Sequence, residues 1–216
     1  FEPKGRSPEF NLWNISEFAR DVLIPITGVR PFPMNELTLM VGAVVSCRPT
    51  HIFEWGTNVG VSARIFYETC KSLGWQIPIH SIDLPDDENH IEHPRNHRGR
   101  LVKNINQVTL HQGDGMDTSL ATYKASRNKG RPLFFLDGDH SYESVRRELV
   151  GIFKAVPEAS FLLHDTFFQS PESGYNIGPN KAVREFLAKH HKAFTVTEQN
   201  FGLPGMTFLR NMSVGG

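Results

Sequence analysis

The sequence has only two cysteines, Cys47 and Cys70, among its 216 residues. Two cysteines cannot build the disulfide framework of a small secreted domain, so we expect both to be reduced core residues of a cytoplasmic protein. Long hydrophobic runs are also missing, since none approaches the roughly 20 apolar residues of a membrane span. We find no secretory signal pattern either. These absences argue against a disulfide-rich or membrane-spanning protein.

The sequence also lacks an excess of charge of either sign, because 23 Lys and Arg balance 23 Asp and Glu. Nucleic acids and anionic membranes attract surplus basic side chains, so we expect neither as a partner. The length suits one α/β domain. The chain begins with Phe1, and residues 5–10 read as a cloning remnant or trimmed boundary. We therefore expect an N-terminal extension with a helix over 1–34 and the main domain over 35–216. Composition leaves a homo-oligomer open.

Apolar runs alternate with amphipathic stretches, which predicts an α/β fold with a largely parallel sheet. Short runs rich in Ile, Val, Leu and Phe predict buried parallel strands at 51–55, 79–83, 108–112, 132–137 and 160–164. We predict helices at 14–24 (capped by Ser16), 35–47, 61–73, 95–106, 117–128, 142–156 and 180–191. Alternating residues at 194–198 and 206–210, joined by a turn containing Gly and Pro, predict a final antiparallel hairpin.

The most informative segment is HIFEWGTNVGVS, residues 51–62. An apolar run ends at Glu54, Gly56 and Gly60 follow in a loop, and Ser62 begins a helical stretch. Glycines let the backbone approach a ligand closely, and an acid at a strand end accepts hydrogen bonds from that ligand. The segment therefore predicts one side of a ligand cleft.

Acidic residues follow the next two strands as well. Asp83 ends the second strand, where a carboxylate can accept from both hydroxyls of a ribose. Asp114 follows Gly113 after the third strand and is suited to accept from an adenine amino group. Each signal is weak alone, because an Asp at such a position also forms turns and helix caps.

The last two parallel strands end in clusters of ionisable residues. Asp137 is followed by Asp139 and His140, and the next strand ends in His164 and Asp165. Ionisable groups at a buried strand end are costly unless a ligand, a metal or a proton transfer compensates. Capping by Asp139 or Ser141 would explain part of the first cluster but leaves Asp137 unexplained.

This ordered series resembles the class I S-adenosylmethionine-dependent O-methyltransferases. It is most similar to the small group with the cephalosporin-hydroxylase-like and macrocin-type sugar methyltransferases, over roughly residues 35–210. The resemblance implies a Rossmann-like, doubly wound sheet of seven strands with a C-terminal antiparallel hairpin. It implies S-adenosylmethionine as cofactor and a small-molecule hydroxyl as acceptor. By position it assigns the cofactor to these residues: Glu54, Gly56, Thr57, Gly60, Ser62, Asp83, Asp114 and Asp137.

The resemblance also implies a divalent cation, magnesium or manganese, at Asp137, His164 and Asp165. The chain departs from the family here, because relatives usually have paired oxygen ligands where this chain has His164 and Asp165. Magnesium prefers oxygen, so an imidazole favours manganese, iron or zinc. Asn58 also replaces a usual glycine, and asparagine tolerates unusual backbone dihedrals.

The chemistry implied is an in-line methyl transfer from a sulfonium to an acceptor oxygen. The protein must align donor and acceptor and must deprotonate or polarise the hydroxyl. His140 is our candidate base, because a histidine titrates near neutrality and this one adjoins Asp137. A metal at Asp137 would do the same work by lowering the pKa of the hydroxyl.

Other interpretations remain open at this point. A non-catalytic cofactor-binding domain or an NAD-dependent oxidoreductase would share the strand, loop and helix of residues 51–62, although G-x-G-x-x-G is absent. A hydrolase is disfavoured because no G-x-S-x-G is present. His90, His93 and His97 are interrupted by Pro94, which favours a solvated loop over a zinc site. Several aromatic residues are candidates for an acceptor pocket, although core packing is commoner: Phe10, Trp13, Phe167, Phe168, Tyr175 and Phe201.

Overall fold

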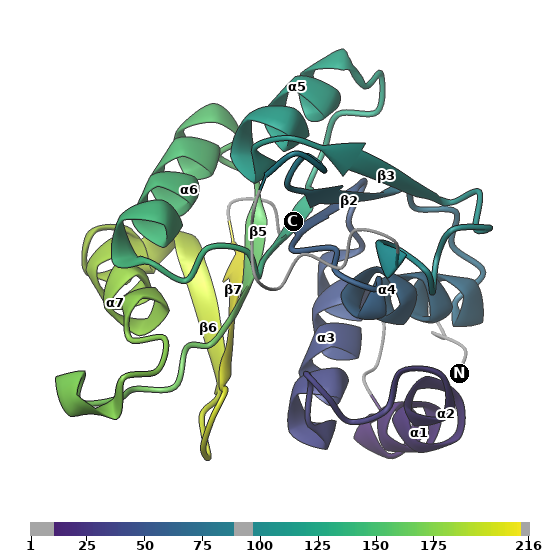
Figure 1. The fold of residues 1–216 in the computed structure, drawn as a ribbon, viewed down its shortest axis with the longest axis horizontal. Helices are drawn as coiled ribbons and strands as arrows, with labels where there is room; N and C mark the ends of the chain where they lie inside the picture. The colour runs from purple at the N-terminus through teal and green to yellow at the C-terminus, as the bar shows by residue number, and fades with distance from the viewer. Residues whose placement is uncertain (1–10, 89–96, 213–216) are drawn as a thin grey trace.

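Seven strands share one sheet in the order β3-β2-β1-β4-β5-β7-β6 (Figure 1). The structure is a computed structural model that describes residues 11–88 and 97–212. The first five strands are parallel, and β7 runs antiparallel to both β5 and β6. The predicted sheet and its C-terminal hairpin are thus confirmed. The strands are β1 Ile52–Trp55, β2 Ile79–Asp83, β3 Val108–Gln112, β4 Leu133–Leu136, β5 Ser160–His164, β6 Phe194–Gln199 and β7 Met206–Asn211.

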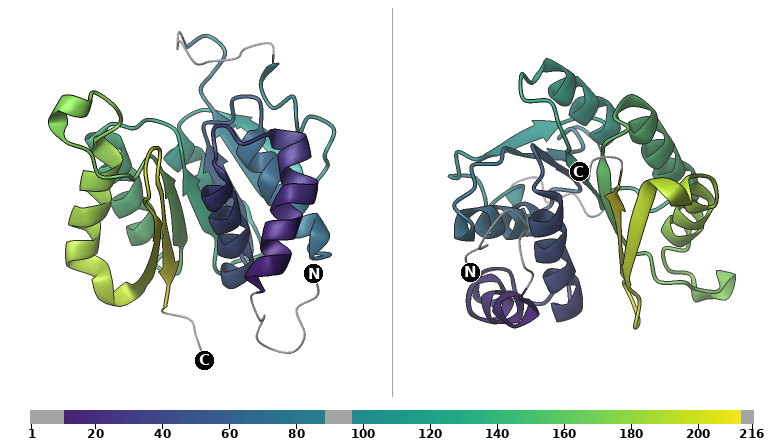
Figure 2. Two further views of the ribbon diagram at one scale, coloured as in Figure 1. Left: turned by 90° about the horizontal axis from the view of Figure 1, so that it is seen from below. Right: turned by 180° about the vertical axis from the view of Figure 1, so that it is seen from behind.

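Helices cover both faces of the sheet (Figure 2). One face packs against α3 (Met34–Cys47) and α4 (Val61–Ser72), and the other against α5 (Gly115–Ala125), α6 (Tyr142–Ala155) and α7 (Gly178–His190). Neighbouring strand residues point to opposite faces, so Phe134 joins the core beneath α5–α7 while Phe135 joins the core beneath α3 and α4. This two-sided burial explains why the central strands are continuous apolar runs.

The first helical segment is longer and more irregular than predicted. It comprises α1 (Leu12–Phe18), a π-helical turn η1 (Ala19–Leu23) and α2 (Ile24–Thr27). The cap is Asn11, whose side chain accepts from the amides of Trp13 and Asn14, and the predicted cap at Ser16 is wrong. The Ser16 hydroxyl lies inside the helix and donates to the carbonyl of Leu12. Ile15 and Leu23 are fully buried in the same core as α3.

The helix predicted at 95–106 is wrong over the described residues 97–106, which form turns. The Gly99 amide donates to the carbonyl of Asn58, and the Leu101 amide donates to that of Val59. These bonds tie the segment to the loop after β1, so its backbone cannot complete a helical ladder. The strand that follows, β3, lies at the sheet edge and is half exposed rather than buried.

The structure bears on two expectations drawn from composition, the state of the cysteines and the lack of a membrane span. Cys47 and Cys70 are both free and buried, and burial raises the pKa of each thiol, to about 11 and about 12 respectively. Among the described residues, no helix is both long enough and apolar enough to cross a membrane.

Candidate functional site

A cavity of about 1790 Å³ opens at the carboxyl ends of the five parallel strands. Single-ligand pockets usually measure about 300–1,000 Å³, so this one has room for two small molecules side by side. Most of the predicted site residues line it: Gly56, Thr57, Ser62, Asp83, Asp114, Asp137, His140, His164 and Asp165. Glu54 lies just beneath the lining, and Gly60 lies outside it. Asp139, from the same turn as His140, also lines the cavity.

Glu54 is completely buried at the end of β1. The Ser62 hydroxyl donates to its Oε2 at 2.7 Å, while Oε1 has no hydrogen-bond partner among the described residues. Burial raises the pKa of this carboxyl to about 7, against the lowering effect of the hydroxyls of Ser81 and Ser62. An unsatisfied buried acceptor of this kind is suited to a donor supplied by a ligand.

Gly56 and Gly60 are required in the loop for different structural reasons. Gly56 has φ +89°, and a Cβ there would lie 2.1 Å from the carbonyl oxygen of Asp137. Gly60 also has φ +89°, but its Cβ would meet Val102 and Gly99 rather than the cavity. Gly60 therefore shapes the loop from behind, whereas Gly56 lets the ends of β1 and β4 lie close together. Asn58, with φ +45°, adopts the left-handed backbone that its residue type tolerates.

Gly56→Ala is expected to destabilise the protein more than Gly28→Ala does, by about 1–3 kcal/mol. Both glycines have positive φ, but nothing lies within 4 Å of a Cβ at Gly28. The difference between the two variants therefore isolates the clash with Asp137. Urea denaturation of both variants measures it, and equal losses would contradict the close approach of β1 and β4.

Asp83 is held firmly at the end of β2. Its Oδ2 accepts from the Asn58 amide at 3.0 Å, and its Oδ1 accepts from the Leu84 amide at 2.8 Å. Arg98 lies 3.6 Å from Oδ2 and also pairs with Asp86 at 2.8 Å. These contacts orient the carboxylate at the cavity wall.

Asp114 serves first as the N-cap of α5, because its Oδ1 accepts from the amide of Asp117. Its Oδ2 pairs with Arg147 of α6, and the side chain is 40% exposed. Asp114 does line the cavity, but both of its oxygens already have partners. Its predicted contact with an adenine remains a prediction.

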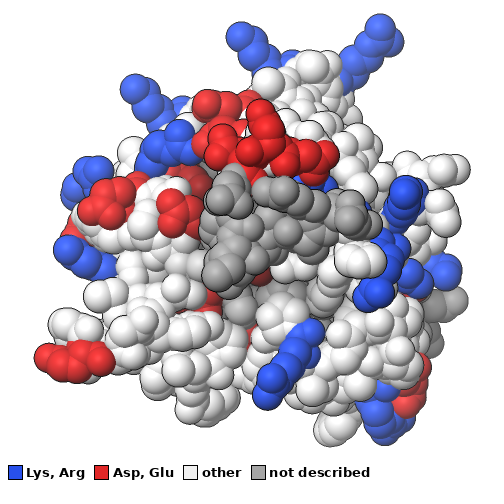
Figure 3. Space-filling model, viewed as in Figure 1, with Lys and Arg blue, Asp and Glu red and all other residues white. Residues whose placement is uncertain are grey.

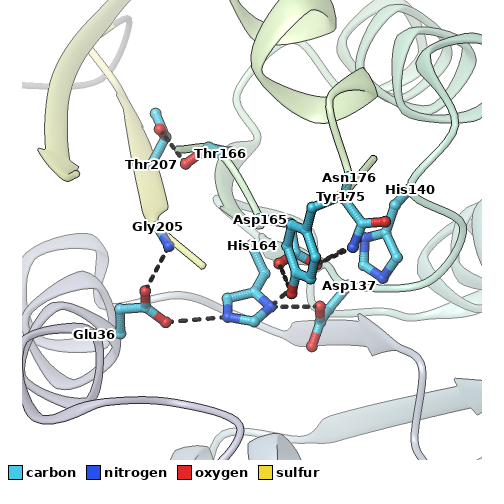
Figure 4. A network of polar contacts seen from close by, with 10 residues as sticks. All are labelled: Glu36, Asp137, His140, His164, Asp165, Thr166, Tyr175, Asn176, Gly205 and Thr207. Carbon is cyan, nitrogen blue, oxygen red and sulfur yellow. Dashed lines mark hydrogen bonds and ion pairs between the residues drawn. The ribbon is translucent and has the colours of Figure 1, made fainter. Parts of the chain in front are cut away.

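His164 lies between two carboxylates at the end of β5 (Figure 4). Its Nδ1 is 2.9 Å from Asp137 Oδ1, and its Nε2 is 3.0 Å from Glu36 Oε2. Burial alone would lower the pKa of this imidazole, but the charge and hydrogen bond of Asp137 and the hydrogen bond to Glu36 outweigh it. The pKa is held well above the usual value. In this geometry the imidazole donates from both nitrogens.

Asp165 collects three donors beside this group (Figure 4). Tyr175 donates to Oδ1 at 2.9 Å, Asn176 donates to Oδ2 at 2.9 Å, and His140 Nδ1 lies 3.1 Å from Oδ2. Burial and the Asp165 carboxylate raise the pKa of Tyr175 to about 12, so this phenol stays protonated. With Nδ1 held by Asp165, His140 keeps Nε2 for another partner.

Three atoms of this group have the spacing of a cation site. Single ligand atoms of Asp137, His164 and Asp165 all lie within 4.8 Å of one another. His164 Nδ1 lies 2.9 Å from Asp137 and 3.7 Å from Asp165, so it faces both carboxylates. A cation bound there would take the place of the Nδ1 proton, while Glu36 would still accept from Nε2.

Sequence reasoning missed several residues of the site. Glu36 of α3 is buried and holds His164, and Asn176 holds Asp165.

Of the predicted aromatic residues, Tyr175 lines the cavity. Phe168, Phe201 and Trp13 are strongly exposed and do not line it, and Phe10 lies outside the described residues. Phe32, which was not predicted, lines the cavity and packs against the ring of His164. His90 and His93 lie outside the described residues, and His97 is exposed.

Comparisons with known proteins bear on the family and the fold. Residues 31–210 match the family described as rhamnosyl O-methyltransferase/CmcI. No curated protein matches the sequence. The fold is similar to that of CalS11, a TDP-rhamnose 3'-O-methyltransferase of calicheamicin biosynthesis, with 17% identity, a TM-score of 0.59 and coverage of 92% and 91% of the two chains.

Two further solved structures share the fold. TomG from Streptomyces achromogenes, in complex with S-adenosylmethionine, has 14% identity, a TM-score of 0.57 and coverage of 94% and 91%. The S-adenosylhomocysteine-bound methyltransferase PaMTH1 from Podospora anserina has 16% identity, a TM-score of 0.56 and coverage of 94% and 88%. At these identities the likeness concerns the fold.

Proposed function

The chain belongs to the rhamnosyl O-methyltransferase/CmcI family, and we propose that it transfers a methyl group from S-adenosylmethionine to a hydroxyl of a sugar or other small metabolite. The observation that carries this proposal is the His140–Asp165 pair, 3.1 Å apart, in the same cavity as Asp83 after β2 and Asp137 after β4. One molecule can occupy the loop after β1 while a second presents its hydroxyl to His140.

We assign the methionine part of the cofactor to the loop after β1. The unpartnered Glu54 Oε1 supports this, because a ligand ammonium would satisfy it. Thr57 and Ser62 line the cavity beside it, and Gly60 contributes through the shape of the loop. Asp83 is assigned to the ribose hydroxyls and Asp114 to the adenine end.

A binding titration with S-adenosylmethionine, S-adenosylhomocysteine and NAD tests the assignment. We expect the first two to bind and NAD not to bind, because the chain has no G-x-G-x-x-G loop for a pyrophosphate. Binding of NAD alone would instead favour the oxidoreductase. Binding of S-adenosylmethionine without turnover on any of a panel of sugars, phenols and other metabolites would favour a non-catalytic domain.

Asp83→Ala is expected to weaken S-adenosylhomocysteine binding by about 1–3 kcal/mol, the usual cost of losing a charge-assisted hydrogen bond. Asp86→Ala is the matched control, since Asp86 also pairs with Arg98 but does not line the cavity. Calorimetry on both variants separates ribose recognition from the ion pair. A loss of the same size in Asp86→Ala would contradict the assignment.

In the proposed reaction S-adenosylmethionine supplies the methyl group from its sulfonium. His140 accepts the hydroxyl proton at Nε2, because Asp165 holds its Nδ1. Tyr175 and Asn176 fix Asp165, so the pair is oriented before the acceptor arrives. Phe32 and Pro204 add apolar surface to the cavity lining.

We also propose a divalent cation held by Asp137, His164 and Asp165. The donor set fits one, since an imidazole nitrogen faces two carboxylate oxygens within 4.8 Å. When bound, it would lower the pKa of the acceptor hydroxyl. A nitrogen donor favours manganese, iron or zinc over magnesium.

The face that carries the acidic side chains is consistent with a small-molecule partner rather than nucleic acid. On the face in Figure 3, acidic side chains gather in the upper part of the view, and Lys and Arg lie mostly at the margin. The cavity lining has the same bias, with carboxylates such as Asp139 and Glu143 outnumbering arginines. We propose a cytoplasmic enzyme, in keeping with its two free buried cysteines.

A further inference from the structure

Glu36 is a buried carboxylate that the methyl transfer described above does not use. It lies on α3 with 1% of its surface exposed. Both of its oxygens are engaged: Oε2 lies 3.0 Å from His164 Nε2, and Oε1 accepts from the Gly205 amide at 2.9 Å (Figure 4). A charged group is rarely buried this completely unless its partners require it.

The two partners of Glu36 come from different walls of the cavity. His164 ends β5, whereas Gly205 belongs to the turn between β6 and β7, next to the cavity-lining residues Leu203 and Pro204. Gly205 has φ +82°, and a Cβ there would lie 2.5 Å from the Phe167 amide, so this turn has little freedom. One carboxylate thus fixes the imidazole and the hairpin turn together.

His164 is held on its other sides as well. The ring of Phe32 meets the imidazole edge to face, with ring centroids 4.9 Å apart. Because Nε2 is directed at Glu36, the opposite nitrogen, Nδ1, is directed at Asp137 and Asp165. If Glu36 did not accept from Nε2, the ring could turn over and take Nδ1 away from Asp137 and Asp165.

We propose that Glu36 is a positioning residue that keeps His164 Nδ1 directed at Asp137 and Asp165 and so makes the imidazole a cation ligand. The inference rests on the proposed cation site. Outer partners of histidine ligands fix the tautomer and the ring orientation, and their loss commonly costs 10–100-fold in metal affinity. Glu36 has this relation to His164, although it lies 128 positions away in the chain.

The experiment is a Mn²⁺ titration of the full chain, followed by electron paramagnetic resonance. Glu36→Gln keeps the size of the side chain but has one acceptor oxygen for two donors. We expect its Mn²⁺ affinity to fall about 10–100-fold, with S-adenosylhomocysteine affinity within about twofold of wild type. Glu68→Gln, at another buried glutamate that pairs with Arg64, is the matched control and should leave Mn²⁺ affinity unchanged.

A second variant of the protein, in which His164 is replaced, distinguishes positioning of the imidazole by Glu36 from a general loss of structure at the site. In His164→Glu no imidazole needs an acceptor, so adding Glu36→Gln should cause no further loss of Mn²⁺ affinity. An equal loss in both backgrounds would overturn the proposal, as would an unchanged affinity in Glu36→Gln when the wild type binds Mn²⁺.

Histidine ¹⁵N spectra of the metal-free protein keep the test independent of the cation. We expect the Nε2–H signal of His164 to shift or vanish in Glu36→Gln and to persist in Glu68→Gln. A wild type that binds no Mn²⁺ would refute the proposed cation site and the ligand role of His164 with it. An unchanged signal in a folded Glu36→Gln protein would refute the positioning by Glu36 even where Mn²⁺ binds.

Discussion

Replacing His140 with glutamine is expected to lower kcat by about 10²–10⁴-fold, the usual contribution of a positioned general base. The side chain is 26% exposed at the cavity, and its Nδ1 is held by Asp165. Glutamine keeps a polar group of similar size but cannot take the proton. S-adenosylhomocysteine affinity should stay within about twofold, because the loop after β1 is untouched.

Two companion variants sharpen the test of His140. Asp165→Asn should also lower kcat, because His140 loses the carboxylate that orients it and the proposed cation loses a ligand. His191→Gln changes an exposed histidine of the turn after α7 and serves as the matched control, with unchanged kcat. Unchanged turnover in His140→Gln would show that the base lies elsewhere in the cavity.

The parts of the candidate site whose placement at the strand ends could be predicted are those encoded locally. Glu54, Asp83 and Asp137 each follow a run of apolar residues, and parallel strands bring their carboxyl ends to one edge of the sheet. Ser141 could be predicted as a cap of α6 for the same reason, because a helix start and its cap are adjacent in sequence.

The missed parts depend on contacts between distant segments. Glu36 is one of several polar residues in a largely apolar helix, and nothing near it in sequence indicates that His164 will meet it. The helix predicted at 95–106 fails for a similar reason, since Gly99 pairs its backbone with the loop after β1. A periodic pattern cannot anticipate such a tertiary contact.

The second prediction with a large expected effect concerns the proposed cation. If Asp137, His164 and Asp165 hold a metal, a chelator should lower kcat by more than about 100-fold, since metal polarisation supplies several kcal/mol to such steps. Activity should return with Mn²⁺ more fully than with Mg²⁺, because His164 offers a nitrogen. Anomalous density should appear between Asp137 and Asp165 in a crystal soaked with manganese.

Asp137→Asn and Asp139→Asn form a matched pair for the cation. Both acids lie in the turn after β4, but Asp139 bonds to Ser141 and lies outside the ligand set. Only Asp137→Asn should abolish the response to Mn²⁺.

If a chelator does not change turnover in the wild type, the charge that offsets Glu36, Asp137 and Asp165 must be the His164 imidazolium itself. Its pKa is held well above the usual value by Asp137 and Glu36 against the effect of burial. His140 would then be the sole base.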